Sequence, residues 1–412
     1  MALSNPSSAI QSIIDAAVSD YMAMAVYVFT DFDGSGVPSA KFFSPSKIEV
    51  WDSSHSFVSA ANLPNTLFEI GSISKVFTSR IFYGLQGTYD GNTVGSCMPS
   101  ISLPAAISGI PVADIITYAS GFPQDDGLPP DPRGQFCPAS NLQTFAKLVD
   151  WFNSGQNSAW ICPAGQCYTY SNLAWSPLAI VGLNPQNPYV DVYNAYNGQL
   201  AELCADLGMG NTALFNTSQV PSMACGYDGT TAFTVNQSYL PCPPMVFGSG
   251  SIVSSASDML QWLLYNMGQL QPSPTEFAIL QTQQQQTGSA RGQCGTTGTC
   301  SVQAQGPTVG IGWFFPNIAG AAGRVLSKDG GVPGFSSWMG FESWVQNGAN
   351  APSCNGVVVL SAGALASPVG QKIMSTLLDS VTDNPAKGLN VYDFDDPASL
   401  SGRAESPAAT HP

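Results

Sequence analysis

The stretch FEIGSISKVFTSRIFYGL, from Phe68 to Leu85, combines a helical pattern with a candidate nucleophile. Its apolar residues recur at the spacing of one helix face: Ile73, Val76, Phe77, Ile81 and Leu85. Ser72 and Lys75 stand three residues apart, so they are neighbours on the helix surface. A serine at a helix N-terminus has its own N–H free to stabilise an oxyanion, and a lysine held among apolar residues can lose its proton and activate the hydroxyl. A surface serine beside a solvated lysine would fit S-x-x-K equally well, so the motif needs support from the rest of the chain.

Other bases are scarce in this sequence. The chain has two histidines, His55 and His411, and His411 is the second residue from the end. A Ser-His-Asp triad would have to use His55, and no G-x-S-x-G nucleophile elbow is present. We therefore expect no histidine-based metal site, and we expect acid–base catalysis from Lys, Tyr, Asp or Glu.

Charge and hydropathy limit the kinds of partner. The net charge is −15 with only 12 Lys and Arg, which disfavours binding to a phosphate backbone. No apolar run reaches the roughly 18 residues that a membrane span needs. Hydrophobic residues make up 44% of the chain, enough for a sizeable core. The expected partner is a small-molecule, short peptide or ester substrate, and the oligomeric state is left open.

The ten cysteines favour an oxidising compartment, because their number is even and the sequence lacks the CxxC pairs of zinc sites. Cys162–Cys167 and Cys294–Cys300 each bracket a short glycine-containing loop, so each pair is a candidate local disulfide. The N-terminus lacks the basic region and apolar core of a signal peptide. We interpret the chain as the mature form of a secreted or periplasmic protein, with an added Met.

Strand and helix patterns occur at both ends of the chain, around a middle rich in Pro, Gly and Asn. Strands are predicted at Ala23–Thr30, Lys47–Trp51, Gly310–Phe315, Ser336–Phe341 and Gly356–Ser361. Helices are predicted at Ser8–Tyr21, Asn141–Phe152, Val190–Leu207, Ser255–Asn266 (capped by Ser255 or Ser257) and Val369–Val381. Gln281–Gly306 is interpreted as a long surface loop. The predicted organisation is one sheet domain from residues 1–88 and 246–396, a helical, loop-rich insert at 89–245, and a disordered tail at 397–412.

Two further segments suit catalysis beside Ser72. Tyr170-Ser171-Asn172 precedes an apolar helical run; Tyr170 could share protons with Lys75, and Asn172 could bind Lys75 or a substrate amide. The simpler interpretation is a turn with a helix N-cap. Lys328-Asp329-Gly330-Gly331 stands at the end of an expected strand, where two glycines let a substrate approach and the Gly331 N–H can complete an oxyanion hole. The alternative there is a hairpin with a Gly-Gly turn.

Together, in this order, the three motifs resemble those of the serine β-lactamase and penicillin-binding-protein superfamily. The Y-S-N form is similar to that of the branch with class C β-lactamases, D-alanyl-D-alanine carboxypeptidases, D-aminopeptidases and related esterases. Three other segments resemble landmarks of this family: Val112–Pro123, with Tyr118 in place of the usual His, Phe247–Leu263, and the strand pair GIGWFF and GGVPGFSSWMGF. The resemblance covers about Ile10 to Val381.

The resemblance implies an α/β fold, in which an antiparallel sheet flanked by helices is joined to a mostly helical second domain, with the site between them. It implies Ser72 as the acylated nucleophile, Lys75 and Tyr170 as the general acid–base pair, and Asn172 as a residue that positions the substrate. Lys328 would supply positive charge near the substrate and Tyr170. The N–H groups of Ser72 and Gly331 would form the oxyanion hole, next to Gly330. The resemblance implies no metal or organic cofactor.

Asp329 departs from the β-lactamase pattern. β-Lactamases usually have Thr or Ser here, whose hydroxyl helps to hold the substrate carboxylate, and an Asp facing the cleft would repel that group unless Lys328 offset it. Asp at this position is more typical of esterase-like members, whereas Lys328 is typical of β-lactamases. We expect an ester or amide hydrolase. A true β-lactamase, a D-alanyl-D-alanine carboxypeptidase or D-aminopeptidase, an acyltransferase, and a penicillin-binding sensor that acylates without turnover are the alternatives.

Overall fold

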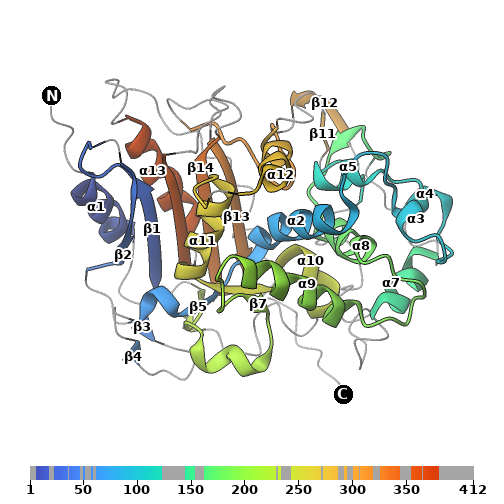
Figure 1. Ribbon diagram of the computed structural model, residues 1–412, viewed down its shortest axis with the longest axis horizontal. Coiled ribbons are helices and arrows are strands. Elements are labelled where there is room, and N and C mark those ends of the chain that lie inside the picture. The colour runs from blue at the N-terminus through green and yellow to red at the C-terminus, as the bar shows by residue number, and fades with distance from the viewer. Residues whose placement is uncertain are drawn as a thin grey trace, which may run out of the picture.

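A five-stranded antiparallel sheet joins the two ends of the chain (Figure 1). Its strands, in spatial order, are β13 (Val325–Val332), β14 (Phe335–Glu342), β15 (Gly356–Ala362), β1 (Met24–Thr30) and β2 (Ser39–Phe43). N-terminal and C-terminal strands meet where β1 pairs with β15. The prediction of one sheet built from both termini is confirmed, and so is its antiparallel form.

The computed structural model describes most of the chain, with gaps. The described ranges are 6–17, 23–35, 37–46, 50–51, 57–58, 62–122, 144–153, 162–228, 231–232, 243–270, 272–285, 292–294, 300–305, 307–318, 325–343, 354–363 and 365–379. His55, His411 and the tail 397–412 lie outside these ranges, so the expectations about them stay untested. Within them, no helix is both long and apolar enough to cross a bilayer.

Helices cover both faces of the sheet. Strand side chains alternate between faces, so Val26 and Val359 pack with α1 (Ser7–Ala17) and α13 (Ala366–Asp379) in one apolar cluster. The residues that alternate with them belong to the larger core, together with α2 (Ser74–Gln86) and α11 (Ala256–Asn266). Burial of these two faces is the main favourable term holding the helices to the sheet.

Helix α2 lies between the sheet and the helical part of the molecule (Figure 1). The predicted stripe is buried from Ile73 to Ile81, and Phe77 stacks on Trp262 at a ring-centroid distance of 4.0 Å. The helix ends at Gly87, which adopts a left-handed conformation with φ 73°. A buried helix of this kind holds the residues at its N-terminus rigidly.

The helical part packs around α2 on the side away from α1 and α13 (Figure 1). Its helices are α3 (Val94–Cys97), α4 (Ala105–Ser108), α5 (Val112–Ile116), α7 (Thr144–Asn153), α8 (Asn172–Gly182), α9 (Val192–Asp206), α10 (Pro243–Gly250) and the 3-10 helix η6 (Thr217–Ser222). The short strands are β3 (Val50–Trp51), β4 (Phe57–Val58), β5 (Leu67–Glu69), β6 (Cys167–Tyr168), β7 (Ala213–Leu214), β8 (Tyr227–Asp228), β9 (Thr231–Ala232) and β10 (Ile252–Ser255). The domain boundaries given above stay a prediction.

The long, periodic segments were predicted to within a few residues. Helices α1, α7, α9, α11 and α13 overlap the predicted helices, strands β1 and β3 fall within the predicted strands, and β14 and β15 extend past theirs by one residue at one or both ends. The predicted ends at 18–21, 47–49, 141–143 and 380–381 lie outside the described residues. Ser255, one of the two proposed caps, accepts the N–H of Asp258 at 3.2 Å and begins α11.

The predicted strand at Gly310–Phe315 is wrong. Phe314 makes isolated bridges to Val309 and to Ser327, and the segment forms no continuous ladder. Lys328 to Gly331 lie inside β13, and the turn to β14 is made by Pro333 and Gly334, whose φ is 87°. The alternative of a Gly-Gly turn is therefore wrong as well.

The surface loop predicted at Gln281–Gly306 is also wrong in part. Helix α12 (Pro274–Gln284) extends into it, and β11 (Gly292–Cys294) pairs with β12 (Cys300–Gln305). Gln283 and Gln284 are buried: Gln283 donates to Tyr89 Oη at 3.1 Å and Gln284 to the carbonyl of Asn266 at 2.9 Å.

The cysteines follow the expectation in part. Cys162 and Cys167 form the predicted local disulfide. The backbone register places Cys294 opposite Cys300, and a bridge between them stays a prediction. Cys97 and Cys204 are free thiols buried in the core, contrary to a fully paired set. Burial raises the pKa of the Cys204 thiol to about 12, so this thiol is protonated at neutral pH and unreactive.

Candidate active site

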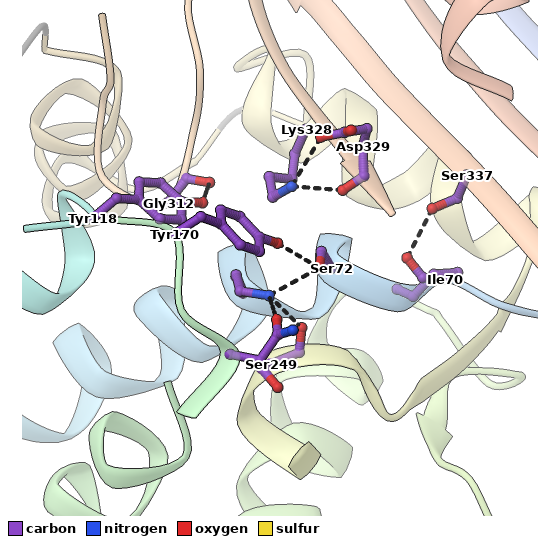
Figure 2. Close-up of polar contacts among 11 residues, drawn as sticks. Ile70, Ser72, Tyr118, Tyr170, Ser249, Gly312, Lys328, Asp329 and Ser337 are labelled. Atoms are coloured by element: carbon purple, nitrogen blue, oxygen red, sulfur yellow. Dashed lines mark hydrogen bonds and ion pairs between the residues drawn. The ribbon is translucent and has the colours of Figure 1, made fainter. Parts of the chain in front are cut away.

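Ser72 lies in the 3-10 turn η2 (Gly71–Ile73), immediately before α2. Its hydroxyl oxygen accepts hydrogen bonds from Tyr170 Oη at 2.6 Å and from Lys75 Nζ at 2.9 Å (Figure 2). The neighbouring Ser74 is fully buried, and its Oγ accepts the N–H of Ile252 at 3.2 Å. Ser72 is thus the serine that faces two proton-transferring groups, and Ser74 joins α2 to β10.

Lys75 is fully buried beneath Ser72, in the first turn of α2. Besides Ser72, its Nζ donates to Asn172 Oδ1 at 2.6 Å and to the carbonyl of Ser249 at 3.0 Å (Figure 2). These three acceptors are uncharged oxygens. They aim the Lys75 nitrogen at the Ser72 hydroxyl, as a general base requires. The Ser249 carbonyl was not anticipated from the sequence, because a backbone acceptor has no residue signature.

The Tyr170-Ser171-Asn172 segment is both a helix cap and part of the site. Ser171 is the N-cap of α8, and its Oγ accepts the N–H of Ala174 at 3.3 Å. Capping fixes the residue before it and the residue after it, so Tyr170 reaches Ser72 and Asn172 reaches Lys75. The two interpretations of this motif are therefore compatible.

Tyr118 supports the Tyr170 ring. The two rings stack at a centroid distance of 5.5 Å and an interplanar angle of 12°, and Tyr118 also stacks on Phe314 at 4.8 Å. Its hydroxyl donates to the carbonyl of Gly312 at 2.8 Å, while its own carbonyl accepts the N–H of Thr169 at 2.7 Å. Burial holds the pKa of Tyr118 well above its usual range, so this tyrosine stays neutral. Tyr118 therefore holds Tyr170 in place in two ways. Its ring stacks on the Tyr170 ring, and its carbonyl binds the backbone of the preceding residue, Thr169.

Sequence reasoning identified Tyr118 only as a departure from the family pattern and missed this supporting role. The residue has a φ of 56°, an unusual left-handed conformation for a tyrosine. A bulky aromatic residue in place of an expected histidine was the signal that could have drawn attention to it.

Lys328 also lies beside the Tyr170 ring. Its Nζ is 5.5 Å from the Tyr170 ring centroid and 5.2 Å from that of Phe314. The same nitrogen donates to Asp329 Oδ1 at 3.0 Å and to the Asp329 carbonyl at 2.6 Å (Figure 2). Burial disfavours the charged form of Asp329, but the Lys328 ammonium and its hydrogen bond hold the pKa of this carboxyl below its usual range. The two residues form an ion pair.

Strand β13 passes very close to the Ser72 turn. Gly71 has a φ of 48°, and a Cβ on it would lie 2.8 Å from the backbone nitrogen of Gly331. A Cβ on Gly330 would lie 2.9 Å from the backbone nitrogen of Ser72 and would collide with the Ile70 carbonyl, which Ser337 Oγ contacts at 2.7 Å. Only glycines allow this approach. It brings the backbone of Gly330 and Gly331 against that of Gly71 and Ser72, next to the nucleophile.

The structure thus gathers every residue predicted for the site. Hydrogen bonds link Ser72, Lys75, Tyr170 and Asn172; Lys328 and Asp329 pair beside Tyr170; Gly330 and Gly331 line the Ser72 turn. Within the part of the chain that the structure describes, no group of three or more His, Cys, Asp or Glu residues could hold a metal ion. The arrangement is suited to nucleophilic catalysis by a serine with lysine and tyrosine as proton carriers.

Comparisons with known proteins agree with this geometry. A family model described as Beta-lactamase matches residues 53–360. No curated protein matches the sequence. A solved structure of a β-lactamase/D-alanine carboxypeptidase from Pseudomonas syringae is similar with a TM-score of 0.63 at 17% identity, covering 92% of this chain and 100% of that one.

Two class C β-lactamase structures are similar to the same degree. One from Rhodobacter sphaeroides has a TM-score of 0.62 at 19% identity, covering 92% of this chain and 99% of that one. One in complex with cefoxitin has a TM-score of 0.63 at 18% identity, covering 90% and 99%. At these identities the likeness establishes a shared fold.

Proposed function

Because the chain belongs to the β-lactamase family, we propose that it is a serine hydrolase that forms an acyl-enzyme on Ser72. The observation that carries the proposal is the Ser72 oxygen held at 2.6 Å from Tyr170 Oη and 2.9 Å from Lys75 Nζ. A hydroxyl between two proton carriers can lose its proton as it attacks and regain it when the acyl group leaves.

The proposed reaction has two halves. Ser72 Oγ bonds to the substrate carbonyl carbon while its proton passes to the Lys75–Tyr170 pair, and the pair then protonates the leaving group as the old bond breaks. Water next attacks the acyl ester, gives one proton to the pair, and releases the acid as Ser72 Oγ takes that proton back. No oxidant, reductant or other reactant is needed.

Backbone groups support the proposed negative charge on the substrate oxygen. The N–H groups of Ser72 and Gly331 are the proposed donors, which is supported by the close packing of β13 against η2. Donors fixed in advance at an oxyanion stabilise the transition state without reorganisation, typically by about 3–4 kcal/mol per donor. Asn172, which Lys75 already contacts, would position the substrate.

The proposed substrates are esters and amides of broad type, because the Lys328 charge is paired with Asp329. Hydrolysis of β-lactams is the second candidate, and it is favoured by Lys328 standing beside Tyr170 as the family pattern requires. A D-alanyl-D-alanine carboxypeptidase or D-aminopeptidase, and a sensor that stays acylated, use the same first step and differ in how the acyl-enzyme breaks down.

We also propose that the protein is exported to the cell exterior or the periplasm. The Cys162–Cys167 disulfide supports this, since such bridges persist in oxidising compartments. Reaction of the protein purified from its native compartment with a thiol reagent, before and after reduction, would reveal whether this bridge forms in the cell.

One set of incubations tests the proposed chemistry. The protein is mixed in turn with a p-nitrophenyl ester, a chromogenic cephalosporin and a fluorescent penicillin, and both turnover and intact mass are followed. Fast ester cleavage with a transient acyl adduct is expected. Stable adducts without turnover would instead indicate a sensor, and rapid cephalosporin cleavage would indicate a β-lactamase.

A matched serine pair tests the nucleophile. Ser72→Ala should lower kcat/KM by about ten-thousand-fold or more and abolish the acyl adduct. Ser74→Ala, two residues along and equally buried, should retain ester hydrolysis at temperatures well below its unfolding transition. Wild-type rates in the Ser72→Ala protein would refute the mechanism.

A further inference from the structure

The Lys328–Asp329 pair is built in an unusual way for two adjacent residues of a strand. Successive side chains of a strand point to opposite faces, yet Lys328 Nζ and Asp329 Oδ1 meet at 3.0 Å. They can meet because β13 is the outermost strand of its sheet and, among the described residues, its outer edge is bridged at Ser327 by Phe314 without a continuous ladder, so both side chains can turn around this edge. The pair therefore lies at the edge that borders the Ser72 site (Figure 2).

The pair differs in exposure between its two members. The Lys328 side chain is 1% exposed, whereas that of Asp329 is 21% exposed. The charge that a bound molecule meets at this edge is therefore the carboxylate, with the ammonium behind it. The charge of Lys75 helps to lower the pKa of Asp329, and Asp329 helps to raise the pKa of the buried Tyr118, both after stronger causes. Asp329 is thus within electrostatic range of Lys75 and of Tyr118, the residue that stacks on Tyr170.

Asp329 is also close to the reacting carbonyl. The next residue, Gly330, lies against the Ser72 backbone nitrogen, and Gly331 supplies the second proposed oxyanion donor. A group two or three bonds from the scissile carbonyl would therefore lie beside the Asp329 side chain. A substrate carboxylate at that place would face a like charge, and it could reach Lys328 only by breaking the ion pair.

We propose that Asp329 is a specificity-determining residue that makes the site reject substrates with a carboxylate next to the scissile bond and accept neutral or ammonium-bearing ones. The inference rests on the proposed function and names its substrate class. Its physical basis is that like charges placed together in a partly dry site repel each other, whereas an ammonium or amide group would find an acceptor there.

Three matched esters test the proposal. They are the phenylacetyl esters of glycolic acid, glycolamide and choline, which share one acyl group and place a carboxylate or an amide three bonds, or an ammonium four bonds, from the scissile carbonyl carbon. Each kcat/KM is divided by the rate constant for hydroxide-catalysed hydrolysis of the same ester. For the wild type we expect the amide and ammonium esters to exceed the carboxylate ester by about tenfold or more, which corresponds to about 1.4 kcal/mol.

Asp329→Asn keeps the shape of the side chain and removes its charge. The carboxylate-to-amide ratio of kcat/KM should rise by about tenfold or more in this variant, since Lys328 then becomes available to the carboxylate. Asp329→Ser gives a second, smaller neutral residue. Asp206→Asn, at the exposed end of α9, matches the change in net charge and should leave the ratio unaltered.

The outcomes separate this proposal from the one on which it rests. A wild-type enzyme that cleaves the carboxylate ester as fast as the amide ester overturns the proposal, even if both Asp329 variants fail to fold. A ratio that stays constant in an active Asp329→Asn enzyme overturns it as well. Failure of the proposed function would appear differently, as cleavage of all three esters by the Ser72→Ala protein.

Discussion

Two buried lysines border Tyr170, and they differ in what they contact. Lys75 donates to three uncharged oxygens, those of Ser72, Asn172 and Ser249. Lys328 donates to a carboxylate, that of Asp329. A lysine that is hydrogen-bonded to the nucleophile can exchange a proton with it, while a lysine charge that is paired with a carboxylate is largely compensated. The role of a lysine near a serine therefore depends on the groups that the lysine contacts, and not on its proximity alone.

The largest effect on activity is expected when Lys75, the lysine that contacts Ser72, is removed. Lys75→Met keeps roughly the length of the side chain and deletes its nitrogen, so Ser72 loses one of its two proton carriers. We expect kcat/KM for ester hydrolysis to fall by about ten-thousand-fold, near the upper limit for general acid–base catalysis. Steady-state kinetics measures this, and Lys372→Met on the exposed side of α13 is the control. Near wild-type activity would mean that Lys75 has only a structural part.

Tyr170 stands between the two lysines, and its hydroxyl is the link to Ser72. Tyr170→Phe keeps the ring that Tyr118 stacks on and removes the 2.6 Å hydrogen bond. We expect kcat to fall by about a hundred- to a thousandfold with a much smaller change in KM, because the lost group acts on the proton in transit. Tyr189→Phe, at an exposed tyrosine, provides the matched control. Equal losses in kcat and in substrate affinity would instead indicate a binding role.

The ion pair itself can be measured with a double-mutant cycle. Lys328→Met, Asp329→Asn and the double variant are unfolded in urea beside the wild type. We expect a coupling free energy of about 1–3 kcal/mol, because each single change leaves the charge of its partner unpaired in a buried or partly buried place. Additive effects of the two changes would show that the pair contributes no stability.

The pH dependence of that stability should follow Asp329. Its pKa is lowered from the ordinary value of 3.8 in the folded protein, so its contribution is present above that value and is lost as the pH falls through the folded pKa. The difference in unfolding free energy between wild type and Asp329→Asn should therefore be constant near neutral pH and shrink below about pH 4. Urea titrations at several pH values measure this. A difference that grows in acid would have the wrong sign for an ion pair.

Much of this site could be predicted because chemistry limits the choices. With two histidines in the chain, a serine three residues before a lysine had few competitors, and the structure places Ser72 and Lys75 in contact. The sheet was predictable for a similar reason, since runs such as Gly356–Ala362 are apolar throughout and fit only a buried strand.

What could not be predicted depends on contacts between distant segments. The aromatic run ending at Phe315 has the composition of a strand, yet Phe314 packs on Tyr118 and bridges Ser327 without forming a ladder. The pairing of Lys328 with Asp329 depends on β13 being the outermost strand of its sheet, and no residue pattern in the sequence reveals that position. Gln283 and Gln284 look like surface residues in the sequence, but Tyr89 and Asn266 offer their amides partners in the core.

The buried glutamines at the end of α12 limit how the length of the chain can change at this point. They begin the uninterrupted run from Gln283 to Gln286. An added glutamine anywhere in the run yields the same protein as one added after it, so positions 283 and 284 keep their amides and the extra residue falls beyond the helix. The loss of three, by contrast, would place Thr at position 284, opposite the Asn266 carbonyl. Expansion of this repeat, or the loss of one or two glutamines, therefore leaves both buried amides in place, whereas the loss of three removes one of them.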